Sequence, residues 1–196
     1  MGNIIDLYAR AAATLYGIIS FDDFFRILDT YYGEGSLSQD RIMQYFWTEE
    51  PDDPIYYIEE DLIVHTSISF AEIARTLHGI QHPVGVIAPR QHKILPEKEF
   101  LLYANPFYYE DSEGTRKMTA YLTDLGIPQE DVREIVAEMA FLCRTGSCPT
   151  LLMDALLRRG YSVGRDLDLI IIGTDLEAET RQWERLGYTG REMAGC

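Results

Sequence analysis

The sequence predicts a mostly helical α+β protein, with an N-terminal winged-helix-like unit that carries a β-hairpin and a C-terminal helical unit. Apolar residues recur at helical spacing through most of the 196 residues. Two short runs rich in β-branched and aromatic residues adjoin near residues 55–69, as the strands of a hairpin do. Proline and glycine concentrate between the two helical regions. We therefore expect units at residues 1–69 and 96–196, joined by a connector at 70–95.

The first elements follow from local signals. Apolar side chains at three- and four-residue spacing predict a helix over residues 3–15, and the β-branched stretch "IIS" after Gly17 predicts a short strand. Ser20 precedes two aspartates, and a serine cap with carboxylates in the first turn is a favourable helix start. The second helix therefore begins after Ser20 and ends at Gly33.

A third helix and the hairpin complete the N-terminal unit. Ser36 or Ser38 caps the third helix, which runs to about Trp47. The runs "IYYIEE" and "LIVHTSIS" then form the two strands. Helix, strand, helix, helix and hairpin in this order is the layout of a winged helix-turn-helix, in which Arg41 and Tyr45 of the third helix are candidate binding residues.

The C-terminal unit is predicted to be helical throughout. Pro128 occupies the first position of a helix, where its missing N–H removes no bond. A last helix runs from about Asp166 to Leu186 with Gly187 as its cap, although "LDLIII" at 167–172 fits a buried strand equally well. The remaining helices are predicted at residues 70–77, 97–103, 115–125, 128–143 and 150–159.

The charge balance narrows the choice of partners. The net charge is −15, from 32 acidic and 17 basic residues, and residues 1–69 alone contain 13 acidic and 3 basic residues. Such a surface opposes binding to phosphate backbones and anionic membranes. No apolar run approaches the roughly 18 residues that span a bilayer, and no leader precedes the first helix. With three cysteines, the chain is expected to be cytoplasmic, with another protein or a second copy as its partner.

Residues of the kinds used in catalysis are not arranged for a known chemistry. His78 and His82 are four residues apart, so on a helix they would share one face and could bind zinc. Gly79 and Pro83 disfavour a helix at these positions and therefore argue against the zinc site. Cys148 lacks the glycine-rich turn of a nucleophile, and no phosphate-binding loop is present. We therefore predict no catalytic residue, no metal site and no cofactor.

Three hypotheses for the function remain open. The first is a non-catalytic interaction or regulatory protein that docks through an acidic, aromatic-rich surface. The second is a winged-helix DNA-binding regulator that acts as a dimer; the third helix offers it Gln39, Arg41 and Gln44, but the wing turn "EEDL" is acidic. The third is an uncharacterised hydrolase. The acidic surface favours docking.

The C-terminal stretch "TRQWERLGYTGREM" is interpreted as the end of the last helix, anchored by an aromatic ring. Glu177 lies four residues before Arg181, the favourable orientation for a helical ion pair. Arg181, Trp183 and Tyr188 are the candidate binding residues of this stretch.

This stretch resembles the "NNTRLWENRGHTPNEL" signature of a group of uncharacterised Gram-positive bacterial proteins, which often carry a zinc-binding SEC-C tail. "LYGIIS", "DLIVH" and "ILPEKEFLLYANPFYYE" extend the resemblance in the same order. The resemblance implies winged-helix-like and helical parts and brings no activity with it, and the zinc tail has no counterpart here. Glu179, Gly190 and Arg191 depart from the signature, and the residues aligned with it are Thr180, Arg181, Trp183, Gly187, Tyr188 and Thr189.

Overall fold

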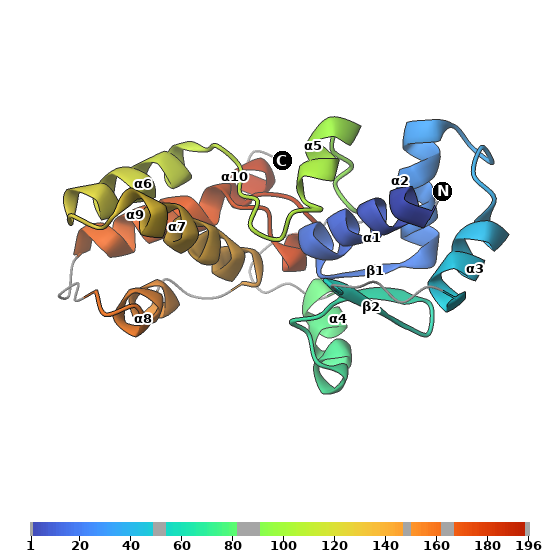
Figure 1. Cartoon of the computed structure of the whole chain (residues 1–196), viewed down its shortest axis with the longest axis horizontal. Helices are drawn as coiled ribbons and strands as arrows, with labels where there is room; N and C mark the ends of the chain where they lie inside the picture. The colour runs from blue at the N-terminus through green and yellow to red at the C-terminus, as the bar shows by residue number, and fades with distance from the viewer. Residues whose placement is uncertain (1, 49–53, 82–90, 147–149, 162–166, 195–196) are drawn as a thin grey trace.

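The computed structural model describes residues 2–48, 54–81, 91–146, 150–161 and 167–194 (Figure 1). Helices dominate these residues and a small antiparallel sheet accompanies them, so the predicted mostly helical α+β class is confirmed. The helices are α1 (Gly2–Tyr16), α2 (Phe21–Tyr32), α3 (Gln39–Thr48), α4 (Ile73–Gln81), α5 (Glu97–Leu102), α6 (Glu113–Asp124), α7 (Gln129–Arg144), α8 (Thr150–Arg158), α9 (Leu167–Glu179) and α10 (Gly190–Ala194), with short 3₁₀ turns η1 (Phe70–Glu72) and η2 (Trp183–Arg185).

The sheet has the strand order β1-β3-β2. Its strands are β1 (Ile18–Ser20), β2 (Tyr56–Glu59) and β3 (Leu62–His65), and both neighbouring pairs are antiparallel. β2 and β3 form the predicted hairpin, and β1 pairs with the edge of β3 that faces away from β2. The order of α1, β1, α2, α3 and the hairpin, together with this pairing, gives the winged-helix-like layout that the sequence predicts.

Two local signals in the N-terminal half act as expected. The Ser20 hydroxyl accepts the Asp23 N–H at 3.2 Å and caps α2, and Gly33, with φ 90°, ends that helix. Phe46 of α3 stacks on Phe21 of α2 with 5.4 Å between the ring centroids. The helices α1, α2 and α3 therefore share an aromatic core with the inner face of the sheet.

The helix α5 packs on α1 and contributes to the same core (Figure 1). Phe100 and Tyr103 are buried there, although they belong to the residues predicted to open the helical unit. The Tyr16 hydroxyl donates to the Lys93 carbonyl at 2.7 Å, and the Tyr31 hydroxyl donates to the Leu95 carbonyl at 2.9 Å. These bonds tie the chain before α5 to the N-terminal helices.

A second core lies between α6, α7, α8 and α9. Residues 167–172 belong to α9, so of the two open alternatives the helix is observed. α6 and α9 approach closely at Gly114, where an added Cβ would lie 2.8 Å from the Leu176 Cα. Glycine is required at this crossing because any side chain would meet backbone.

The predicted last helix is too long, because α9 ends at Glu179 rather than near Leu186. The Thr180 hydroxyl donates to the Leu176 carbonyl at 2.7 Å and the Gln182 amide donates to the Glu177 carbonyl at 3.1 Å, so side chains satisfy the last turn. The chain then bends through η2 and returns, which pairs Arg181 with Thr189 in an isolated β-bridge.

Two further expectations are corrected. The short helix predicted to end near Leu77 continues as α4 to Gln81. The expected ion pair of Glu177 and Arg181 is not formed, since Arg181 lies beyond the helix end and pairs with Glu110 and Glu192 instead. Within the described ranges, no helix is long and apolar enough to cross a membrane.

Candidate functional site

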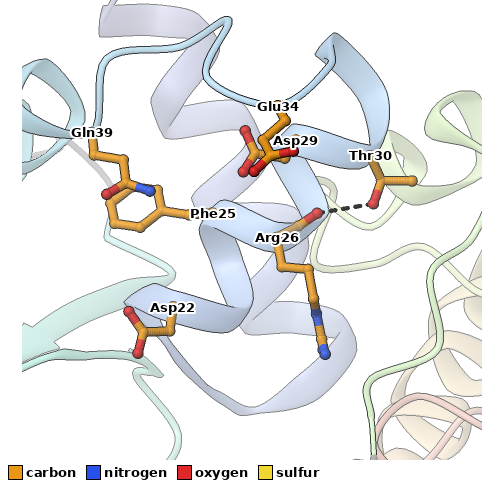
Figure 2. A pocket seen from close by; sticks show the side chains of 7 residues that line it. All are labelled: Asp22, Phe25, Arg26, Asp29, Thr30, Glu34 and Gln39. Carbon is orange, nitrogen blue, oxygen red and sulfur yellow. Dashed lines mark hydrogen bonds between the residues drawn. The ribbon is translucent and has the colours of Figure 1, made fainter.

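An acidic hollow lies beside α2 where the chain turns toward α3, and its volume is about 410 Å³ (Figure 2). Among the described residues that line it are three carboxylates and one cation, Arg26, whose Nη2 atom lies 2.8 Å from an Asp23 carboxylate oxygen. The residues that line the hollow are Asp22, Phe25, Arg26, Asp29, Thr30, Glu34 and Gln39.

The helical repeat and one turn assemble this hollow. Asp22 and Asp29 are seven residues apart on α2 and so lie on one face, two turns from each other. Gly33 then turns the chain, and an Asp29 carboxylate oxygen accepts the Gly35 N–H at 3.2 Å. That turn brings Glu34 back beside Asp29, as Figure 2 shows, and gathers negative charge at one end of the hollow.

The helix α3 adjoins the hollow through Gln39 and presents a mixed outer face. Ile42 and Phe46 are buried against the core, while Gln44 is exposed and Trp47 is 66% exposed. A tryptophan at this exposure is unusual, because large aromatic rings are normally buried. The predicted binding residues of this helix divide: Arg41 is exposed, whereas Tyr45 is half-buried beside the aromatic core.

The hairpin that corresponds to a wing carries only acidic charge at its tip. Glu60 and Asp61 form the turn after Glu59, the last residue of β2, and the Asp61 carbonyl accepts the Phe21 N–H at 2.8 Å, which fixes the turn against the start of α2. We name the hollow, the outer face of α3 and this tip the α2–α3 face. Its described charges are predominantly negative.

Of the C-terminal candidates, Trp183 lies in the interior, while Arg181 and Tyr188 are partly buried. Trp183 is 4% exposed, and its indole N–H donates to the Thr14 carbonyl at 3.1 Å. That carbonyl belongs to the last turn of α1, where helical partners run out. The ring also meets His65 and Phe141, with centroids 5.3 Å and 5.9 Å away. Trp183 therefore connects α1, β3 and α7, and offers little surface to a partner.

Arg181 connects segments that are distant in the sequence. Its Nε atom donates to Glu110 at 2.8 Å, and its Nη1 atom donates to Glu192 at 2.9 Å and to the Gly187 carbonyl at 3.1 Å. Tyr188 is half-buried, with the Lys93 ammonium 5.1 Å from its ring centroid. The structure thus brings Arg181, Trp183 and Tyr188 into one stretch that closes the fold, while Arg41 and Tyr45 belong to the α2–α3 face.

The burial of one charged residue, Arg144, was not predicted from the sequence. Arg144 is fully buried at the end of α7, where its Nη2 atom donates to the Tyr108 carbonyl at 3.2 Å and its guanidinium lies 5.0 Å from the Tyr103 ring centroid. Its spacing of four and eight residues from Ala140 and Val136 places it on the apolar stripe, a signal that could have indicated burial.

Three ionisable groups, His65, Asp23 and Cys143, have shifted pKa values. Burial, with Arg144 nearby, lowers the pKa of His65 to about 4, and the Ser67 backbone N–H donates to its Nδ1 atom at 3.1 Å, a bond that the neutral ring can accept. A hydrogen bond from His92 lowers the pKa of Asp23. Burial raises the pKa of the Cys143 thiol to about 12, which keeps it protonated and a poor nucleophile.

His82 and Cys148 lie outside the described residues. Among those that are described, no group of three or more histidine, cysteine or acidic side chains is arranged to hold a metal ion.

Comparisons of this chain with family models, with curated proteins and with solved structures found no match. The α2–α3 face is therefore interpreted from its own geometry and charge.

Proposed function

We propose that this protein is a non-catalytic interaction protein that docks a basic segment of another protein on the α2–α3 face. The observation that carries the proposal is the hollow of about 410 Å³ lined by Asp22, Asp29 and Glu34, in which Arg26, the one cation of the described lining, is paired with Asp23. A hollow of this kind suits a lysine or arginine side chain, since a guanidinium or ammonium group can meet several carboxylates at once.

The exposed ring of Trp47 supports the same proposal. Tryptophan is enriched among the residues that dominate binding energy at interfaces, because it excludes much water at little cost in conformational entropy. Trp47 and the hollow lie at opposite ends of α3, with Arg41 and Gln44 exposed between them. A partner that follows α3 would contact both.

The proposal is tested by affinity capture from native cells with three forms of the full chain. The first is the wild type, the second is Asp22→Asn/Asp29→Asn/Glu34→Gln, which keeps the oxygen acceptors and removes the charge, and the third is a matched control, Asp124→Asn/Glu130→Gln/Asp154→Asn, at exposed positions elsewhere. We expect a partner held by the wild type and the control and lost from the hollow variant. Equal recovery by all three forms, or no partner at all, would refute the proposal.

The alternative of a DNA-binding regulator has one observation in its favour, which is the winged-helix-like order of elements and strands. Such a protein would read DNA with Arg41 and Gln44 of α3. The acidic hairpin tip and hollow oppose it, since each carboxylate there repels the phosphate backbone. Retention of mixed duplex DNA at about 0.15 M salt, lost in Arg41→Gln, would favour this alternative over docking.

A further inference from the structure

A small cavity lies beside Arg144, the arginine that is buried at the end of α7. Its volume is about 10 Å³, counted as the space open to the centre of a water-sized sphere, so it holds one particle of about that size. The charged side chains on its described border are Glu110, Arg144, Glu179 and Arg181. Cavities that stay empty in proteins are apolar, so a cavity with this border is expected to be occupied.

Arg144 carries hydrogen-bond donors that the described residues leave unused. Its Nη2 atom donates to the Tyr108 carbonyl at 3.2 Å, whereas its Nε and Nη1 atoms are buried and have no acceptor in the described part of the chain. A buried donor without an acceptor loses the hydrogen bonds that water gives it in the unfolded chain, and the loss is larger for a charged group. A particle in the cavity that accepts hydrogen bonds would restore them.

The charge of Arg144 likewise has no carboxylate in contact among the described residues. Glu110 is the carboxylate that attracts it most strongly. That carboxylate accepts hydrogen bonds from the Arg181 Nε atom at 2.8 Å and from the Tyr103 hydroxyl at 2.9 Å. The Tyr103 ring centroid lies 5.0 Å from the Arg144 guanidinium and adds a cation–π contact. Arg144 is therefore a buried cation whose opposite charge lies at a distance.

The other charges near the cavity are paired with one another. Within the described ranges they form the pairs Arg181–Glu110, Arg191–Glu179 and Lys93–Glu192. Arg181 also contacts Glu192, which links the first pair to the third. Each pair contains one cation and one carboxylate, so together these pairs contribute no net charge.

A further group of charges is exposed at the surface. Lys117 contacts both Glu113 and Asp175, and Arg191 lies 3.9 Å from Glu113. The side chains of Glu113, Lys117 and Asp175 are 58%, 41% and 33% exposed, so water screens their charges. Among the described groups near the cavity, Arg144 therefore remains as a buried charge that no group of opposite sign contacts.

We propose that this cavity binds a single small anion of halide size, which in ordinary solution is chloride. Like water, such an anion accepts the hydrogen bonds of the Nε and Nη1 atoms of Arg144, and unlike water it also brings the opposite charge into contact. Oxyanions such as phosphate and sulfate are several times larger than the cavity, so its size selects a halide. The bound ion joins α7 to the chain before α6 and to the chain after α9, and thereby stabilises the folded state.

The first test is urea unfolding of the full chain in mixtures of sodium chloride and sodium gluconate. The ionic strength is held at about 0.2 M, and gluconate is too large to enter the cavity. A ligand that binds only the folded state raises the ratio of folded to unfolded protein with its free concentration. We expect this ratio in the wild type to rise at least about threefold as chloride increases from about 0.01 M to about 0.2 M.

Two variants locate the effect of chloride. Arg144→Met removes the buried guanidinium, keeps much of the apolar volume and should abolish the dependence on chloride. Arg133→Met removes an exposed arginine of the same helix and is the matched control, which should retain it. General effects of the two salts act on all three forms alike, so the difference between the variants reports on the cavity. Circular dichroism verifies that each form is folded.

Crystals of the wild type grown in sodium bromide give a second readout that needs no variant. We expect an anomalous scattering peak within hydrogen-bond distance of the Nε and Nη1 atoms of Arg144. The inference is overturned if that position holds a water molecule without anomalous signal. It is equally overturned if the wild type is as stable in gluconate as in chloride, or if Arg144→Met keeps the dependence on chloride.

Discussion

Replacing Trp183 should unfold this protein under conditions that leave the wild type folded. The ring is 4% exposed, meets His65 and Phe141, and donates its N–H to the Thr14 carbonyl at 3.1 Å. Truncation of a buried aromatic side chain to alanine costs about 3–5 kcal/mol, because the lost burial and the cavity add. That is a large share of the roughly 5–15 kcal/mol by which domains are stable.

Two further substitutions divide this loss into its parts. Trp183→Phe retains a ring but leaves the Thr14 carbonyl without its donor inside the protein, and should cost about 1–3 kcal/mol. Trp47→Ala is the matched control, since the second of the two tryptophans is 66% exposed, and it should change stability by no more than about 0.5 kcal/mol.

The assay is urea unfolding followed by circular dichroism, with the slope of the transition compared among variants to verify that the same surface unfolds. Tryptophan fluorescence gives an independent readout: acrylamide should quench the wild type in two populations, and Trp47→Phe should remove the accessible one. A loss below about 1 kcal/mol in Trp183→Ala, or equal losses at positions 183 and 47, would refute the assignment of Trp183 to the closure of the fold.

Three more predictions concern the groups around Trp183. Gly17 has φ 75° and a Cβ there would overlap the Trp183 ring, so Gly17→Ala should cost about 3 kcal/mol, against about 1 kcal/mol for Gly35→Ala, which has φ 71° and open space; equal midpoints in urea would contradict this. The folded-state pKa of His65, about 4, lies below its ordinary value of 6.5, so protonation favours the unfolded chain: its contribution is complete above about pH 6.5 and declines as the pH falls toward 4. The stability difference between wild type and His65→Asn should therefore change by about 3 kcal/mol between about pH 7 and pH 4, and a pH-independent difference would exclude this role. Arg181→Met leaves Glu110 without its cation, while Glu192 keeps Lys93, 3.4 Å away, and it should cost about 2–3 kcal/mol, since both carboxylates keep some contact with solvent. Arg158→Met removes an exposed pair with Glu138 and should change stability by less than about 1 kcal/mol; a larger loss than at Arg181 would invert the expected ranking.

The elements that local chemistry specifies were predictable from the sequence. Ser20 caps α2 because its hydroxyl reaches an N–H only three residues ahead, and Gly33 ends the same helix because it tolerates φ 90°. The hairpin followed from two β-branched and aromatic runs separated by a short turn. Each of these signals depends only on residues within a few positions of one another. It therefore acts regardless of how the rest of the chain folds.

The candidate site was only partly predictable for the same reason. Arg41 was identified from its place in a winged-helix layout, and its exposure agrees with a surface role. The hollow was not foreseen, because it depends on the turn at Gly33 bringing Glu34 back beside Asp29. The roles of Arg41 and Tyr45 in binding stay predictions until a partner is tested.

Tertiary contacts decided the features that local patterns left open or misjudged. Residues 167–172 fit strand and helix equally well, and packing of Leu169 and Leu176 against α6 and α7 selected the helix. The spacing of the residues after Glu179 predicted a helix. In the structure, Arg181 donates a hydrogen bond to Glu110 and Trp183 donates one to the Thr14 carbonyl, partners 71 and 169 residues away. The sequence by itself therefore determined the class of fold and most helices, through short-range capping and periodicity. Only the folded chain determined how the C-terminal stretch closes it, because those partners are adjacent in space and distant along the sequence.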